Sequence, residues 1–224
     1  KNEVSNMTNV VLTGALSGQG VSGATVQVIQ SGLPMFAMMT REYLGLDPDG
    51  FSNYTDDGFS MLYVGNPNPT ALVGFSTDVV YKKFTFSANF NGALGQDIYN
   101  NTANTILPIT NLGGFRNIAA GLLDSPIQES LTNSAAPSSR FIENGSYLKL
   151  ANATIGYRVG NIGASLKNLN IFFNGTNLLL FTKYSGFDPE VNTAKGVGNT
   201  GSAGIDYIGY PPVRTFNLGV NFSL

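Results

Sequence analysis

The final segment of the chain alternates between small or polar and bulky apolar residues, from Thr215 to Leu224. Successive side chains of a β-strand point to opposite faces, so this alternation gives the segment one apolar and one polar face. About ten residues is also the length of a β-strand that crosses a membrane. The pattern therefore predicts a membrane-spanning strand at 214–224.

The same period of two recurs upstream. In 84–95 the apolar residues hold the even positions, and in 71–81 they hold mainly the odd positions. Only Lys82-Lys83 separates these two segments, which predicts a tight hairpin. Pro34 predicts an irregularity in an earlier segment, because proline cannot donate to a strand ladder. The seven predicted strands are 6–14, 24–40, 71–81, 84–95, 147–159, 168–182 and 214–224.

The connections between these strands alternate in length. Short connections are expected at 15–23, 82–83 and 160–167, and long ones at 41–70, 96–146 and 183–213. Bacterial outer-membrane barrels have short periplasmic turns and long extracellular loops. The fold class predicted is therefore all-β, an antiparallel transmembrane β-barrel segment with its long loops and its C-terminus on opposite sides of the membrane.

Composition narrows the class of protein. Only 12% of the residues are charged and mean hydropathy is +0.05, and no apolar run reaches the roughly 18 residues of a transmembrane helix. The net charge of −2 argues against a nucleic-acid partner. The chain has neither Cys nor His, which excludes Ser-His-Asp and Cys-His catalysis and His-ligated zinc. We therefore expect neither an enzyme nor a cofactor.

The odd number of predicted strands bears on domain organisation. Single-chain bacterial barrels have even counts, and an open edge in lipid leaves backbone groups without partners. We therefore expect residues 1–224 to be the C-terminal part of a larger barrel, with a self-contained barrel of about eight strands as the alternative. Residues 1–20 lack the apolar core of a signal peptide, so we expect that signal to have been removed or to lie outside this sequence.

Six short stretches, spread from residue 65 to the C-terminus, give the sequence a family resemblance. In order and spacing they resemble the C-terminal end of SusC-type TonB-dependent transporters of Bacteroides-like bacteria. The stretches are Gly65–Thr70, Asp97–Asn101, Phe141–Leu150, Asn177-Leu178 with Phe181–Val191, Gly204–Tyr207 and Tyr210–Phe216.

The resemblance implies an outer-membrane barrel of about 22 strands around a plug domain. It implies that the plug and the energy-coupling box lie outside this sequence. It further implies import of a nutrient, such as an oligosaccharide or peptide, with a SusD-like surface lipoprotein and energy from TonB. The alternative is a secreted or surface β-sandwich that binds glycan or a protein partner through Tyr-rich loops.

Three groups of residues are candidates for functional roles. Amide and cationic side chains on the polar faces are candidates to face the lumen: Asn89, Asn91, Asn152, Arg158, Asn170 and Asn174. Aromatic residues of the long loops are candidates to contact sugar or a lid, or alternatively to form a loop core: Phe115, Phe141, Tyr207 and Tyr210. The apolar row of the last strand is a candidate assembly signal: Phe216, Leu218, Val220, Phe222 and Leu224.

Aromatic residues near strand ends are predicted to form girdles at the lipid–water boundary. They are Tyr81, Phe84, Tyr147, Tyr157, Phe181 and Tyr184.

Three weaker motifs have simple structural explanations. Residues 196–201 match G-x-G-x-x-G but lack the strand–helix context of a dinucleotide site, so we expect a tight loop. Asp188 and Glu190 lie too close in one loop for a glycosidase pair. The acidic stretch 47–57 lacks EF-hand spacing; a solvated turn is favoured, and extracellular calcium is the alternative.

Overall fold

The computed structural model describes residues 2–18, 20–114, 116–118, 120–122, 124, 126–163 and 165–224. The chain forms two compact units, each built from three stretches of sequence. The sheet unit comprises 71–94, 146–183 and 211–224. The loop unit comprises 1–70, 95–145 and 184–210.

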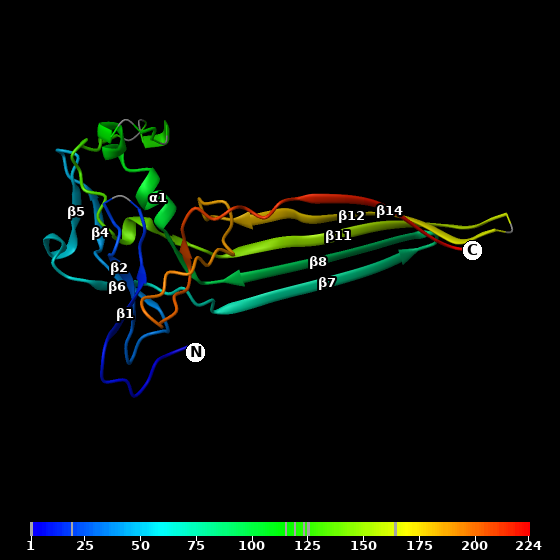
Figure 1. Cartoon of the computed structure of the whole chain (residues 1–224), viewed down its shortest axis with the longest axis horizontal. Helices are drawn as coiled ribbons and strands as arrows, with labels where there is room; N and C mark the ends of the chain where they lie inside the picture. The colour runs from blue at the N-terminus through cyan, green and yellow to red at the C-terminus, as the bar shows by residue number, and fades with distance from the viewer. Residues whose placement is uncertain are drawn as a thin grey trace. The chain divides into compact units, whose positions relative to one another are not determined.

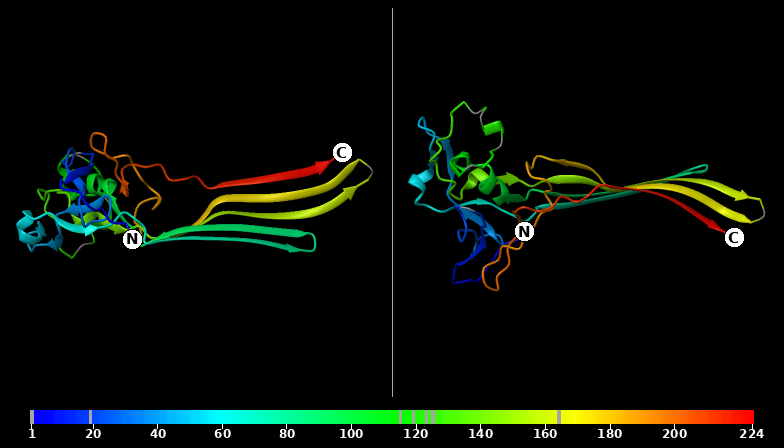
Figure 2. Two further views of the ribbon diagram at one scale, coloured as in Figure 1. Left: turned by 90° about the horizontal axis from the view of Figure 1, so that it is seen from below. Right: turned by 45° about the horizontal axis from the view of Figure 1, so that its top comes forward.

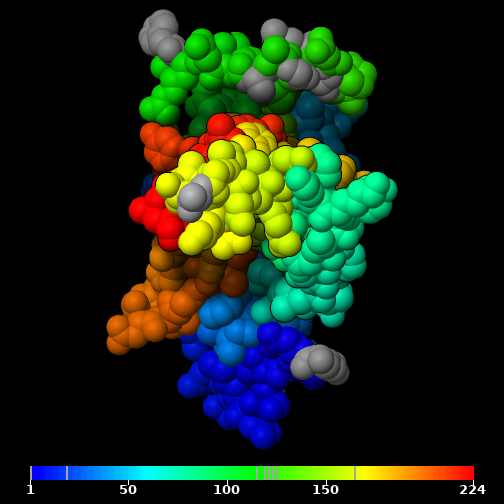
Figure 3. Space-filling model, turned by 90° about the vertical axis from the view of Figure 1, so that its right-hand side faces the viewer, coloured from blue at the N-terminus to red at the C-terminus, as the bar shows by residue number. Residues whose placement is uncertain are grey.

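The sheet unit is one antiparallel sheet of five strands, in the order β14-β12-β11-β8-β7 (Figure 1 and Figure 2). Figure 3 looks along the strands onto their tips, where the end of the chain (red), the β11–β12 turn (yellow) and the β7–β8 turn (teal) follow one another in that order. The strands are β7 (Ala71–Tyr81), β8 (Phe84–Leu94), β11 (Tyr147–Ile162), β12 (Leu166–Thr182) and β14 (Thr215–Ser223).

The register of this sheet confirms the predicted hairpin and the predicted pairing. Tyr81 pairs with Phe84 across the turn, and Phe75 pairs with Phe90 further along the same two strands. Because paired residues share a face, the odd apolar positions of β7 and the even positions of β8 lie together. Phe84 also pairs with Tyr157 of β11, which extends the shared face to the third strand.

A β-bulge in β11 corrects one detail of the predicted alternation. Leu150 pairs with Phe90, whereas Asn152 pairs with Asn89, so Ala151 is the extra residue. The bulge places Leu150 on the apolar face and Asn152 on the polar face, although both positions are even. Sequence alternation alone did not reveal this extra residue, because a strict period of two leaves no position unpaired.

The loop unit is built from short strands and short helices. A four-stranded sheet has the order β1-β2-β3-β6, a three-stranded sheet has the order β10-β9-β13, and β4 pairs with β5. The strands are β1 (Val11–Ala15), β2 (Thr25–Ile29), β3 (Ala37–Thr40), β4 (Tyr43–Leu46), β5 (Ser52–Tyr54), β6 (Leu62–Gly65), β9 (Asp97–Asn100), β10 (Ile142–Asn144) and β13 (Ile205–Asp206). The helices are η1 (Thr55–Gly58), α1 (Asn101–Ile106), η2 (Ile109–Gly114), η3 (Ala120–Leu122) and η4 (Ser139–Phe141).

The first two predicted membrane strands were wrong. The segment 6–14 contains only part of the five-residue strand β1, and 24–40 divides into β2 and β3. The turn between β2 and β3 contains Pro34, as the sequence indicated, and its carbonyl accepts a hydrogen bond from the Ala37 amide. In β2 the consecutive residues Val26, Gln27 and Val28 are all buried within the loop unit, so these strands do not show the two-faced pattern of a strand that contacts lipid. Among the residues that the structure describes, there are therefore five long strands instead of seven.

A hydrophobic core organises the loop unit. Tyr99 is fully buried with its ring centroid 6.5 Å from that of Phe141, and burial of one such side chain contributes about 1.5–3 kcal/mol. The core residues are Leu16, Val21, Val26, Met38, Tyr99, Ala103, Phe141 and Ile205.

The helix α1 was not predicted, although its start carries a recognisable signal. The Asn100 side chain accepts a hydrogen bond from the Ala103 amide, which caps the helix. Asn101, the first helical residue, accepts from the Ser17 amide and donates to the Ser17 carbonyl, both at 2.9 Å. Within the described part of the chain, no helix is long and apolar enough to cross a membrane.

Candidate functional site

One face of the sheet unit is a continuous exposed apolar surface. Phe75 is 58% exposed, Tyr81 66% and Leu218 75%. The surface continues across all five strands because residues that pair across neighbouring strands lie on the same face. One such cross-strand row is Val79, Phe86, Ile155, Phe173 and Leu218. An apolar surface that spans five strands exceeds what a soluble monomer exposes. It is the outward face that a strand of a membrane barrel presents to lipid.

The opposite face of the same sheet is polar and rich in amides. Asn89 Nδ2 donates to Asn152 Oδ1 at 2.7 Å, and Asn174 Nδ2 donates to Thr154 Oγ1 at 2.8 Å. Amide pairs of this kind satisfy one another without charge.

The register assigns all six predicted lumen-facing residues to this polar face. Arg158 pairs with Asn170, and Asn91 pairs with Lys149. Lys149 also lies on this face and is buried, although the sequence analysis did not single it out. That the polar face lines a lumen stays a prediction.

Two of the predicted girdle residues, Phe84 and Tyr157, pair near the turn end of the apolar face, whereas Tyr147 pairs with Ala93 and lies on the polar face, so its assignment was wrong. The ring centroids of Phe84 and Tyr157 lie 4.9 Å apart. Tyr184 was wrongly assigned to such a girdle. It belongs to the loop unit, is only 5% exposed, and donates its hydroxyl to Asp206 Oδ2 at 2.6 Å.

The loop aromatics fall into different environments. Phe141 is 7% exposed in the core of the loop unit. It therefore matches the alternative prediction, a loop core, rather than contact with sugar or a lid. The Tyr207 ring lies 4.1 Å from Lys195 Nζ. Tyr210 is 99% exposed, which leaves its ring free to stack on a ligand. Phe115 lies outside the described residues.

Polar side chains tie distant stretches of the loop unit together. Glu129 accepts two hydrogen bonds from the guanidinium of Arg140, at 3.0 and 2.7 Å, and one from Asn133 at 2.6 Å. This bidentate hydrogen bonding raises the pKa of Arg140. Glu143 likewise accepts from Asn100 and from the amide and hydroxyl of Ser185. Such networks hold long loops in one arrangement.

Comparison with known proteins places this geometry in a family. The chain is 33% identical to the TonB-dependent receptor P3 of Formosa agariphila over 70% of its own length, and 30% identical to the receptor P26 of that organism over 75%. It is 27% identical to the TonB-dependent receptor SusC of Bacteroides thetaiotaomicron over 74%. This chain is a SusC-like TonB-dependent receptor sequence. No protein-family model matches it.

A solved structure supports the fold of this receptor chain. The match to the structure of the RagAB peptide importer in the open-open state covers 99% of the present chain and 25% of the importer chain. Its TM-score is 0.71 and the sequence identity is 22%. At that identity the match shows the fold, an antiparallel transmembrane β-barrel segment. The chain spans 17%, 18% and 16% of the three curated relatives.

The last strand of the receptor chain presents the predicted apolar row on the outward face. Phe216 pairs with Gly175 and Val220 with Ile171, and the rings of Phe216 and Phe173 stack at 5.8 Å. Phe222 and Leu224 are also exposed. The structure thus shows the pattern, while its role in assembly stays a prediction.

The acidic stretch of the receptor chain forms a turn. Asp47 Oδ1 accepts hydrogen bonds from the amides of Asp49 and Phe51, at 3.0 and 2.8 Å. Gly50 has φ 82°, and a Cβ there would clash with the Gln128 carbonyl. In the part of the chain that the structure describes, no three His, Cys, Asp or Glu side chains gather as a metal site. Calcium at 47–57 stays a prediction.

The other two weak motifs also form turns. Gly198 has φ 60°, next to a turn in which the Thr200 amide donates to the Val197 carbonyl. Asp188 accepts from the Glu190 amide at 2.9 Å, so its carboxylate supports the local backbone.

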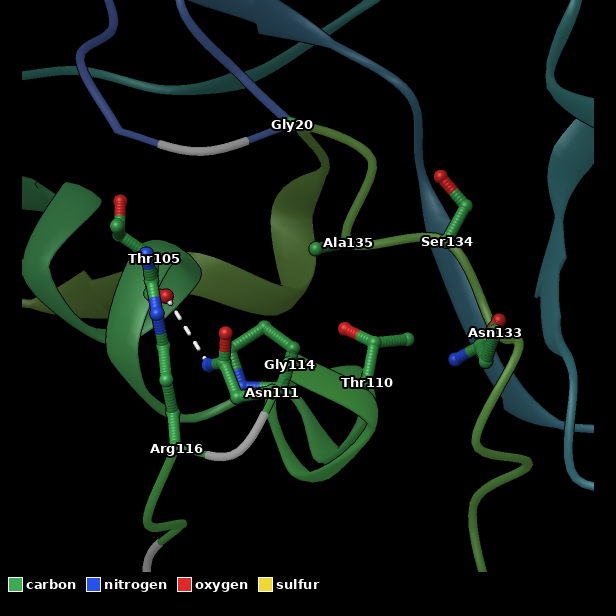
Figure 4. A pocket seen from close by; sticks show the side chains of 10 residues that line it. Gly20, Thr105, Thr110, Asn111, Gly114, Arg116, Asn133, Ser134 and Ala135 are labelled. Carbon is green, nitrogen blue, oxygen red and sulfur yellow. Dashed lines mark hydrogen bonds between the residues drawn. The ribbon is translucent and has the colours of Figure 1, made fainter.

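The loop unit contains a polar cavity of about 290 Å³ (Figure 4). Asn111 Nδ2 donates to the Thr105 carbonyl at its wall. Hydroxyl and amide groups with one guanidinium give the cavity hydrogen-bonding capacity. It is lined by Gly20, Thr105, Pro108, Thr110, Asn111, Gly114, Arg116, Asn133, Ser134 and Ala135.

Proposed function

We propose that this chain forms part of the wall of an active outer-membrane transporter that imports a nutrient. The observation that carries the proposal is the two-faced sheet, with aromatic and aliphatic residues exposed on one face and amides on the other. Its relatives are named TonB-dependent receptors, which supports energy coupling through TonB, and a structural neighbour is named a peptide importer.

Each part of the chain has a role in this proposal. The apolar face contacts the lipid of the outer membrane of a Gram-negative bacterium, and the polar face contacts water, cargo and the plug. The strand β14 pairs with the first strand of the same barrel, because an open edge in lipid leaves its backbone groups without partners.

The loop unit supplies the extracellular surface in this proposal, and a SusD-like lipoprotein docks there to capture substrate. The register supports one aspect of this topology. The chain leaves the sheet for the loop unit only from the strand ends opposite Lys82-Lys83.

The cargo class follows from the chemistry of the polar face. Amide side chains donate to and accept from neutral hydrogen-bonding groups, which both oligosaccharides and peptides offer. The exposed ring of Tyr210 adds an aromatic platform in the loops. We therefore propose an oligosaccharide or a peptide as the imported nutrient.

Cysteine labelling in intact cells tests the topology. With Ser134→Cys and Lys82→Cys in separate receptors, a membrane-impermeant maleimide should label position 134 and leave position 82 unlabelled until the cells are permeabilised. Strong labelling at 82 with none at 134 would reverse the topology.

Assembly is tested through the last strand. Removal of residues 216–224, or Phe222→Asp, should abolish both the appearance of the receptor at the cell surface and nutrient uptake. The reason is that β14 is proposed to act as the assembly signal and to close the barrel by pairing with its first strand. Normal surface levels of the truncated receptor would contradict both roles.

The β-sandwich alternative does not fit the structure. A sandwich buries its apolar faces between two sheets, whereas Phe75, Tyr81 and Leu218 are largely exposed. The match to a solved transporter over 99% of the chain also supports the barrel fold.

A further inference from the structure

The turn between β7 and β8 contains two lysines where turn chemistry alone favours other residues. Two-residue hairpin turns prefer Asn and Gly, which tolerate positive φ. Lys82 has φ 55°, a conformation that is unfavourable by about 1–2 kcal/mol for a residue with a Cβ. Requirements of the backbone therefore do not explain the Lys82-Lys83 pair.

The lysines border the aromatic end of the apolar face. Lys82 Nζ lies 5.3 Å from the centroid of the Tyr81 ring, and Lys83 Nζ lies 3.5 Å from the Val159 carbonyl oxygen. Beneath them Tyr81, Phe84 and Tyr157 form one cross-strand row on β7, β8 and β11. The ammonium groups of Lys82 and Lys83 thus lie at the edge of the apolar face, which contacts lipid in the proposed function.

The charge at this edge has no counter-charge in the sheet unit. The unit contains seven Lys and Arg and a single acidic residue, Asp78. Asp78 pairs with Ser87 on the polar face, away from the aromatic row. Among the residues that the structure describes, neither Lys82 nor Lys83 forms an ion pair with a carboxylate.

We propose that this end of the sheet binds the phosphate headgroup of an anionic phospholipid. The ammonium groups of Lys82 and Lys83 contact the phosphate, for which lysine is a suitable point charge. Tyr81, Phe84 and Tyr157 lie at headgroup depth, where amphipathic rings are favoured. The acyl chains lie along the adjoining row of Val79, Phe86 and Ile155. This contiguous apolar path identifies a lipid, rather than free phosphate, as the occupant.

Native mass spectrometry of the receptor, purified from outer membranes in detergent, tests the site. The receptor is titrated with phosphatidylglycerol and, separately, with zwitterionic phosphatidylcholine. A basic residue near an anionic surface contributes about five-fold in affinity. The wild-type receptor should therefore retain phosphatidylglycerol in preference, by up to about twenty-five-fold for two lysines.

Three variants separate charge from folding. Lys82→Asn with Lys83→Gly removes both charges and supplies favoured turn residues, so the receptor should assemble normally and lose the preference. Lys82→Arg with Lys83→Arg should keep it. Lys183→Gln removes one charge at the opposite end of the sheet and should also keep it.

Three results would overturn the proposal. They are equal retention of both lipids by the wild-type receptor, an unchanged preference in the Asn-Gly variant, and full displacement of phosphatidylglycerol by millimolar inorganic phosphate. Transport is measured in parallel on the same variants. Loss of the lipid preference with normal uptake leaves the proposed transport function intact, whereas loss of uptake alone leaves the lipid site intact.

Discussion

The two units of this chain show how one sequence is adapted to two solvents. The loop unit has a buried core that includes Tyr99 and Met38, and it carries five basic and thirteen acidic residues. The sheet unit exposes its aromatic residues and carries seven basic residues and one acidic residue. Apolar side chains thus point inward where water surrounds the fold and outward where lipid does.

Internal polar contacts differ between the units in the same way. In the loop unit, the buried carboxylates of Glu129 and Asp206 accept hydrogen bonds from Arg140 and Tyr184, which lie 11 and 22 residues away in sequence. In the sheet, neutral amides on adjacent strands bond to one another. The loop unit is held by charge-assisted contacts across long sequence separations, whereas backbone ladders hold the sheet.

The largest expected effect comes from placing charge on the outward face of the sheet. Leu218→Arg should prevent membrane assembly, because a basic residue facing lipid near the midplane is unfavourable by about 2–4 kcal/mol. Asn217→Arg, one residue earlier on the polar face, is the matched control and should assemble. The amounts of the two variants in the outer membrane are compared by membrane fractionation. Equal levels would show that the two faces are not in different solvents.

Breaking a buried ion pair should affect the loop unit next most strongly. Glu129→Gln leaves the guanidinium of Arg140 without its counter-charge, which should destabilise the loop unit by about 3 kcal/mol. Asp49→Asn, at an exposed turn, is the control. Amide hydrogen exchange should become faster at residues 129–141, while the exchange rates of the sheet strands should not change. Increased exchange in both units would contradict their energetic independence.

Removing one buried hydroxyl should have a moderate effect. Tyr184→Phe deletes the 2.6 Å hydrogen bond to Asp206, and a hydrogen bond to a charged group contributes about 1.5–3 kcal/mol. Tyr210→Phe removes an exposed hydroxyl and should be neutral. Proteolysis of the 184–210 loop in assembled receptors distinguishes the two. Equal cleavage rates would show that the buried bond does not hold this loop.

The same tyrosine predicts how alkaline pH acts on the loop unit. Burial, and then the hydrogen bond to Asp206, raise the pKa of the Tyr184 phenol, while in the unfolded chain it stays near 10. The stabilisation is therefore fully present below about pH 10 and is lost as pH rises through the folded-state pKa. Tyr184→Phe should flatten this dependence.

The smallest effect should come from the polar face of the sheet. A double-mutant cycle of Asn89→Ala and Asn152→Ala should give a coupling free energy of about 1 kcal/mol, because a neutral hydrogen bond contributes about that much. Stability of the assembled receptor in detergent provides the measurement. A coupling near zero would mean that water satisfies these amides equally well.

The long strands could be predicted from sequence because lipid imposes a strict rule. Every outward position of β8 and β14 must be apolar or small, so the alternation persists over the whole strand. The segments 6–14 and 24–40 had a less clear pattern, with Pro34 inside the second, and they contain only short strands of the loop unit. Strand length, rather than period, separated the two cases.

The loop unit was largely beyond sequence reasoning because its contacts are non-local. Tyr184 meets Asp206 and Asn101 meets Ser17 only after long loops have closed, and no periodic pattern marks such pairs. A loop core was already the alternative for Phe141, but its partner Tyr99 could not be identified because it lies far away in sequence. Asn100 was the exception, because a helix-capping side chain is a local signal.

The bulge at Ala151 also determines the shape of the wall. At the same level of the neighbouring strand, residues 177 and 178 fall outside the pairing, and Asn177 has φ 52°. The two irregularities form a single crease across β11 and β12. Bulges bend and twist strands locally, so we expect the sheet to bend along this line. Deleting Ala151 would straighten the crease and widen the circumference that the surrounding strands must close.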